Sequence, residues 1–333
     1  MIKTANIIPI IFLTFYNFFF TTYVHAASFD CTKARSTMEK AICPDASLSS
    51  LDEKLAFEYK TARSKLSPTA DKILISSQRS WLRFIATYCF VDMNASVVSH
   101  QEATSCLIKS YNERIKDLSS TGKIIAGYKT YIAIDNHIRV SKPQEMVYVI
   151  ERKYMQVDDE SPIGIRLNHY LNFKDKADLP EERGTESYDI QLSQASPDWL
   201  YKKIFSEAFT GAYPTSDTEC GVFSIEKERP LKISDVFTGN TWQKIFESTT
   251  QSHFLELAKI EKDFDISMVS DFRPSTAQPS ASFSFCFTNK GIDVDGFLPH
   301  VARAFDGVTI SWKSLENTLT PYALEQVKKM GGL

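Results

Sequence analysis

Basic residues are not in excess in this sequence of 333 residues, which has 38 Lys and Arg, 41 Asp and Glu, and a formal net charge of −3. Proteins that bind nucleic acid usually carry a clear basic excess, because they neutralise phosphates. The composition therefore argues against a nucleic-acid partner. A mildly acidic chain is suited to a cationic protein partner.

The sequence also lacks the short motifs of common catalytic sites. It contains no G-x-S-x-G nucleophile elbow, no H-E-x-x-H helix, no P-loop and no G-x-G-x-x-G turn. Apart from His25, each histidine is isolated along the chain, and a lone histidine is more often structural than catalytic. We therefore predict no enzyme activity, no catalytic residue and no cofactor.

The cysteines lack the spacing of a zinc site, since no two of them form a C-x2-C pair and no histidine is placed to complete a site. No metal site is predicted. The six cysteines are Cys31, Cys43, Cys89, Cys106, Cys220 and Cys286. An even number in an oxidising compartment indicates three disulfides. Their positions favour Cys31–Cys43, Cys89–Cys106 and Cys220–Cys286, and a crossed pairing of Cys31 with Cys89 or Cys106 is the alternative.

Residues 1–26 have the pattern of a signal peptide. Lys3 supplies a positive start, an apolar run extends from Ile7 to Phe20, and Val24-His25-Ala26 predicts cleavage after Ala26. Cleavage removes Lys3 and so changes the formal charge from −3 to −4. We expect a periplasmic or secreted protein without stable membrane insertion. The alternative is an uncleaved anchor over Met1–Val24.

The following residues, 27–120, have a helical period and predict an all-α domain. Leu51, Leu55, Tyr59, Ala62 and Leu66 fall at spacings of three and four, as on one apolar helix face. The pattern indicates an antiparallel helical hairpin with a short appendage at each end. Arg114 is expected to form an ion pair on a helix face.

Three helix starts can be read from the same part of the chain. Ser36 and Glu39 form a capping-box pattern, and Ser67-Pro68 combines a cap with proline at the first helical position. Ser49 or Ser50 is expected to cap the helix between them.

Residues 121–333 predict an α+β domain, because alternating strand patterns surround one substantial helix. The helix is expected from Thr241 to about Lys262. We predict an antiparallel sheet with this helix packed on one face. The main expected strands lie at Tyr131–Asp135, Met146–Val157, Tyr188–Leu192, Ile204–Thr210, Cys220–Ile225, Phe283–Phe287, Ile292–Val294 and Val308–Trp312.

A family resemblance covers about residues 29–120. Its motifs are Phe29-Asp30-Cys31, Glu39 to Cys43, Leu51 to Leu55 with Tyr59, Gln78 to Leu82, Cys89, and Cys106-Leu107 with Tyr111 and Arg114. In order and spacing they resemble the LprI-type lysozyme-inhibitor domain. This resemblance implies a small disulfide-stabilised helical fold and a lysozyme-binding role.

A looser resemblance covers about residues 200–319. Its motifs are Gly211 to Pro214, Val222 to Ile225, Pro230 to Phe237 with Trp242, Phe285 to Thr288, and Val308 to Leu315. They resemble the extracellular domain of the RsiV type, whose members include an anti-sigma factor that senses lysozyme by binding it. This chain has Tyr213 where the family commonly has histidine, which weakens transfer of function through that loop. The signalling role is not carried over.

Both resemblances point to a lysozyme-binding protein that inhibits lysozyme and protects peptidoglycan. Acidic loops would attract a cationic partner, and exposed aromatic residues often anchor interfaces. The alternative is a non-catalytic module that binds peptidoglycan or another envelope glycan. The candidate partner contacts are Asp158, Asp159, Glu160, Tyr213, Asp217 and Glu219.

Overall fold

The computed structural model describes residues 27–92, 96–141, 146–173, 183–209, 211, 213–262, 264–269, 285–294 and 307–333. The expected signal peptide and the start of the expected strand at Phe283 lie outside these ranges. None of the helices within them combines the length and the hydropathy needed to span a membrane.

The helical elements include three long helices before residue 120, a fourth long helix later in the chain, and several shorter ones. They are η1 (Cys31–Lys33), α1 (Thr37–Ile42), α2 (Ala46–Ser64), α3 (Pro68–Tyr88), α4 (His100–Ser119), α5 (Pro162–Leu171), α6 (Ile233–Val236), α7 (Thr241–Ile260), η2 (Ile266–Met268), α8 (Trp312–Leu315), η4 (Glu316–Thr318) and α9 (Pro321–Lys329).

The strands belong to a large and a small sheet. They are β1 (Lys123–Ile125), β2 (Tyr128–Ile134), β3 (His137–Ser141), β4 (Met146–Val157), β5 (Gly184–Gln194), β6 (Trp199–Phe209), β7 (Thr215–Ser224), β8 (Arg229–Pro230), β9 (Phe285–Phe287), β10 (Gly291–Val294) and β11 (Val308–Ser311).

Local signals explain most helix starts. The capping box of Ser36 and Glu39 is present, and Ser67 caps α3 with Pro68 at its first position, as predicted. The expected cap of α2 is wrong. The helix begins earlier, because the Asp45 side chain accepts a hydrogen bond from Leu48 N at 2.9 Å. Ser49 instead lies inside α2, where its hydroxyl donates to Ile42 O at 2.9 Å.

Three disulfides connect the chain in the predicted local pairing. Cys31–Cys43 and Cys89–Cys106 lie in the helical part, and Cys220–Cys286 joins β7 to β9. The crossed alternative is therefore not what the structure contains. Each of the two helical-part bridges closes a short loop, which stabilises a domain whose core is small.

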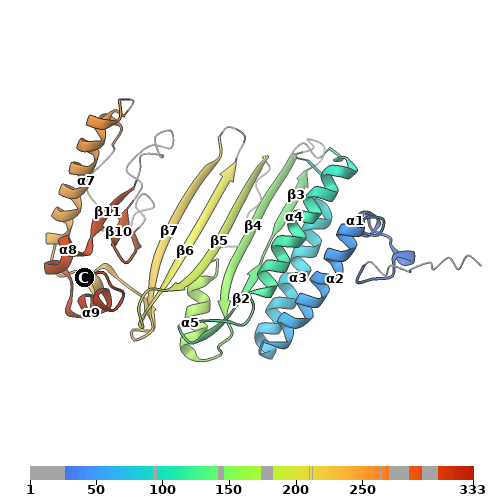
Figure 1. Ribbon diagram of the computed structural model, residues 1–333, viewed down its shortest axis with the longest axis horizontal. Helices are drawn as coiled ribbons and strands as arrows, with labels where there is room; N and C mark the ends of the chain where they lie inside the picture. The colour runs from blue at the N-terminus through green and yellow to red at the C-terminus, as the bar shows by residue number, and fades with distance from the viewer. Residues whose placement is uncertain are drawn as a thin grey trace, which may run out of the picture.

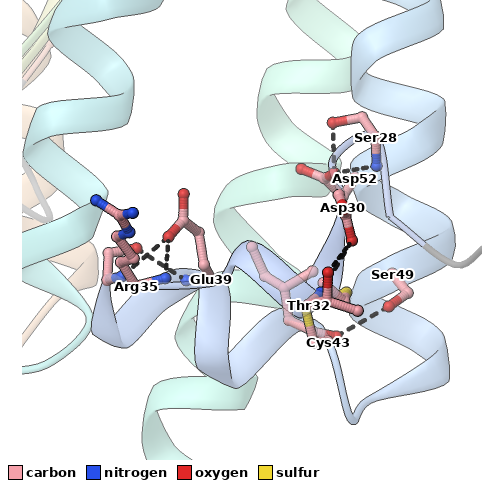
Figure 2. The surroundings of a disulfide bond; sticks show 11 residues. Ser28, Asp30, Thr32, Arg35, Glu39, Cys43, Ser49 and Asp52 are labelled. Carbon is pink, nitrogen blue, oxygen red and sulfur yellow. Dashed lines mark hydrogen bonds between the residues drawn. A yellow bond between two sulfur atoms is a disulfide. The ribbon is translucent and has the colours of Figure 1, made fainter.

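A buried carboxylate fastens the N-terminal segment beside the first disulfide. Asp52 of α2 accepts hydrogen bonds from Ser28 N at 2.7 Å and from Ser28 Oγ at 2.6 Å, as Figure 2 shows. Its other oxygen accepts from the hydroxyl of Tyr111 on α4 at 3.1 Å. Asp52 therefore connects the segment after the expected cleavage point to both α2 and α4.

The large sheet has the order β1-β2-β4-β5-β6-β7-β8, with β3 beside β4, and the small sheet has the order β11-β10-β9. Among the described strands all pairs are antiparallel except β4 and β5, which run parallel. Parallel neighbours need a crossover connection, and α5 is part of this one. The predicted α+β class is confirmed, and its antiparallel sheet has this one exception.

The helix predicted from Thr241 is present as α7, and it packs mainly against the small sheet, in a cluster that also includes Trp199 and Val222 of the large sheet. Trp242, Phe246 and Phe254 of α7 share a hydrophobic cluster with Ile310 and Trp312. In Figure 1, α7 and the small sheet lie at one end of the molecule and helices α1–α4 at the other, with the large sheet between them.

The predicted helical hairpin is present with a third long helix, and α2, α3 and α4 share one hydrophobic cluster with the large sheet. Trp81, Phe84 and Ile85 of α3 belong to the same cluster as Val147 and Val149 of β4. Helix α5 packs with Ile190 and Leu192 of β5 in a separate cluster. This cluster lies on the opposite face of the large sheet from Val147 and Val149, since successive side chains of a strand point to opposite faces. The helical part and the strands after residue 120 thus share one hydrophobic cluster. The predicted boundary between two domains at residue 120 stays a prediction.

Candidate functional site

A groove lies between helices α3 and α4 and strands β2 and β4–β6 of the large sheet. Its cavity measures about 340 Å³. We call it the junction groove. It is lined by Trp81, Phe84, Ile85, Ser110, Glu113, Arg114, Asp117, Ile134, Asn136, Glu151, Lys153, Ser187, Tyr188, Asp189, Phe205 and Glu207.

Acidic side chains outnumber basic ones in the junction groove. Lys153 reaches two of them, with Nζ 3.9 Å from Asp117 Oδ1 and 3.3 Å from Asp189 Oδ2. The other three carboxylates are Glu113, Glu151 and Glu207. Within the described part of the chain, these three have neither a hydrogen bond nor an ion pair. The groove therefore carries uncompensated negative charge.

The pKa values reflect this crowding. Burial raises the pKa of Glu151, and the charge of Glu113 raises it further. Burial also raises the pKa of Asp117. For Lys153, burial acts to lower the pKa, but Asp117 and Asp189 outweigh it and the pKa is raised. Each direction follows from the cost of a desolvated charge and from the sign of its neighbours.

Arg114 lines the same groove, and its predicted ion pair on a helix face is wrong. The side chain is 1% exposed, because it shares the inner face of α4 with Tyr111, Ile115 and Leu118. Nε donates to Gln78 Oε1 at 2.9 Å and Nη2 donates to Ser77 Oγ at 3.3 Å.

The third nitrogen of this guanidinium, Nη1, has no acceptor among the described residues. Burial lowers the pKa of Arg114 to about 10, and the charge of Asp117 opposes this shift only in part. The structure thus places a buried cation with one free donor at the wall of an acidic groove.

A second hollow, of about 510 Å³, continues the groove toward the start of β7. The two share Glu151, Ser187 and Glu207. The second hollow also includes Tyr88 and residues 214–216. The groove therefore extends from Arg114 to the chain segment that follows Tyr213.

The predicted contact residues do not form one patch. Asp158, Asp159 and Glu160 follow the end of β4, whereas Tyr213, Asp217 and Glu219 lie before or within the start of β7. Strand β7 runs in the same direction as β4, since β4 and β5 are parallel and two antiparallel pairs follow. Tyr213 and the segment 158–160 consequently lie at opposite ends of the sheet, whereas Glu219 lies near the middle of β7, at the level of Tyr154.

Their surroundings also differ. The Asp158 side chain is 3% exposed, and its Oδ2 lies 3.4 Å from Lys129 Nζ and accepts from Ser67 N at 3.0 Å. Asp159 accepts from Ser161 N at 2.9 Å and from Ser161 Oγ at 2.8 Å before α5.

Glu160, Asp217 and Glu219 are exposed, and Tyr213 is 77% exposed. Of the predicted contacts, the three near β7 are closest in the chain to the segment that lines the groove.

The groove carboxylates were not predicted as site residues, because no local sequence motif distinguishes any of them. Glu113 lies on a helix and Glu151 and Glu207 lie on strands, so only the packing of α4 against β4–β6 brings them together. Within the described ranges, no group of three His, Cys, Asp or Glu side chains is arranged to hold a metal ion.

Residues 31–118 match the family model described as "Lysozyme inhibitor LprI". The helical part of the chain is similar to the LprI domain family. At the level of that family, the match supports a lysozyme-inhibitor role. The LprI-like region contains α2, α3 and most of α4, and it therefore supplies one wall of the junction groove. Comparison with the curated proteins found no match.

Two solved structures are similar to the chain at low identity. One is a DUF3298 family protein from Pseudomonas aeruginosa PAO1, with 11% identity, a TM-score of 0.45, and coverage of 59% of this chain and 96% of that chain. The other is a DUF3298 member from Bacteroides fragilis, with 14% identity, a TM-score of 0.45, and coverage of 62% and 99%. A likeness at this level carries no argument about function. The RsiV-type resemblance stays a prediction.

Proposed function

We propose that this protein is exported, binds lysozyme and inhibits it, and so protects peptidoglycan. The LprI match over residues 31–118 is the observation that carries this proposal. Three disulfides support it, because disulfides persist in the periplasm or outside the cell.

Charge supports the same partner. Secreted animal lysozymes are strongly cationic, and the junction groove is lined by five carboxylates but only two basic side chains, Arg114 and Lys153. Complementary charge speeds encounter and disfavours wrong partners. Among the predicted contacts, Tyr213, Asp217 and Glu219 are the better candidates, since they are exposed and Pro214 lines the second hollow. Asp158 is already engaged within the protein.

The test is inhibition of lysozyme on a cell-wall suspension by residues 27–333 with the disulfides formed. We expect saturable inhibition near equal molar amounts, weakened by added salt because the attraction is partly electrostatic. The same protein without lysozyme should leave the suspension unchanged, as expected for a protein without enzyme activity.

Absence of both inhibition and complex formation, with c-type and g-type lysozymes alike, would overturn the proposal. Cosedimentation with purified cell wall in that case would favour the alternative, a non-catalytic module that binds peptidoglycan or another envelope glycan.

A further inference from the structure

We propose that the junction groove is where the partner is held, and that it receives a lysine or arginine side chain whose neighbouring main-chain carbonyl accepts from Arg114. This inference rests on the proposed function and adds the site and the chemistry of contact. The cavity of about 340 Å³ lies in the range of pockets that hold small ligands, so it has room for one long side chain.

The carboxylates supply the first argument. Glu113 comes from α4, whereas Glu151 of β4 and Glu207 of β6 lie in register on either side of Ser187 of β5, so the carboxylates reach the cavity from the helix and from the sheet. Lys153 makes its ion pairs with Asp117 and Asp189, and none of these three carboxylates has an ion pair among the described residues. An ammonium or guanidinium group between them would relieve the repulsion that helps to raise the pKa of Glu151.

Arg114 supplies an independent argument, because its guanidinium needs a hydrogen-bond acceptor, which a cation alone cannot provide. Arg114 lines the same cavity, and its Nη1 is buried without an acceptor in the described part of the chain. A buried donor without an acceptor destabilises the folded protein. A ligand that accepts from this donor recovers that free energy on binding. A bare metal ion or a simple amine supplies no acceptor. A basic residue within a protein segment supplies both a cation and a carbonyl oxygen.

Paired charge-neutralising variants test the site. Glu113→Gln with Glu207→Gln removes two exposed groove carboxylates, and Glu256→Gln with Glu325→Gln removes two exposed carboxylates from α7 and α9. Both double variants have the same net charge. Calorimetric titration with c-type lysozyme should show about tenfold weaker binding for the groove variant. The control should change by about twofold or less, as expected for exposed ion pairs. Equal losses in both would overturn the groove as the site.

A second probe separates the groove from the identity of the partner. We expect a blocked Gly-Arg-Gly peptide to shift the Arg114 side-chain NMR signals of the wild-type protein, and its citrulline analogue to leave them unchanged. The groove variant should lose this response. Peptide binding without lysozyme binding would overturn the proposed function and uphold the groove. Lysozyme binding that the groove variant retains would overturn the groove alone, and absence of both responses would overturn both.

Discussion

The hydroxyl oxygen of Ser77 accepts a hydrogen bond from the backbone N–H of Ile134 at 2.7 Å. Ser77 lies on α3 and Ile134 ends β2, beyond the residues that β1 pairs with. The same oxygen accepts from Arg114 Nη2 at 3.3 Å. One serine thus connects both long helices of the groove wall to the edge of the large sheet, where an unpaired strand would otherwise expose its backbone.

Replacement of Ser77 by alanine should lower the free energy of unfolding by about 1–3 kcal/mol, because a buried N–H and a buried guanidinium both lose an acceptor. Urea denaturation followed by circular dichroism measures this. The matched control is Ser76→Ala, which makes the same change at an exposed position of the same helix. Equal midpoints for the two variants would show that the contact adds nothing to stability.

Tyr322→Phe should destabilise the docking of α9. The Tyr322 hydroxyl donates to the Asp198 carboxylate, lies 2.9 Å from Ser224 Oγ and accepts from Trp199 Nε1 at 2.9 Å. Its loss leaves buried polar groups unsatisfied, which costs about 1–3 kcal/mol. Thermal unfolding should show the loss, whereas Tyr213→Phe, which removes the hydroxyl of an exposed tyrosine, should match the wild type. A similar shift in both variants would contradict the prediction.

The double variant Cys31→Ser with Cys43→Ser should lose about 3 kcal/mol of stability, because it frees the loop that this disulfide closes. The difference in the free energy of unfolding between variant and wild type should be present in oxidising buffer. It should become smaller when a reducing agent opens the disulfide of the wild type. Peptide mapping without reduction provides the direct check. Recovery of a peptide that joins Cys31 to Cys89 or Cys106 would show the crossed pairing instead.

Glu151→Gln should stabilise the protein near pH 7 by about 1 kcal/mol and have little effect near pH 4. The folded pKa of Glu151 is raised by burial and by Glu113, so the folded state binds more protons than the unfolded state above the ordinary pKa of glutamate. The contribution of Glu151 to the free energy of unfolding therefore falls as the pH rises from the ordinary glutamate pKa through the raised pKa of the folded state. Glutamine does not ionise and so avoids this loss. Chemical denaturation at several pH values tests this against Glu256→Gln. A variant that is less stable than the wild type at pH 7 would contradict it.

Much of the secondary structure could be predicted because its causes are local. Ser36 with Glu39 and Ser67 with Pro68 start helices through contacts within one turn, and β4 has the predicted bounds Met146–Val157. Helix α5 was not predicted, although Ser161-Pro162 repeats the signal that identifies α3. The predicted start of α2 is too late, since Asp45 caps the helix before Ser49 is reached.

The sequence by itself determined the helices of the first part and the α+β class, since side-chain period and caps act over short stretches of chain. Its cysteine spacing favoured the two short disulfide loops but left the crossed pairing open. Only the tertiary structure decided that β4 and β5 run parallel, that α7 covers the small sheet, and that α3 packs along the edge of the large one. It also decided that Arg114 is buried and that Glu113, Glu151 and Glu207 surround one cavity. The charge and the free donor of such a site depend on neighbours that are distant in the chain, and no local pattern records them.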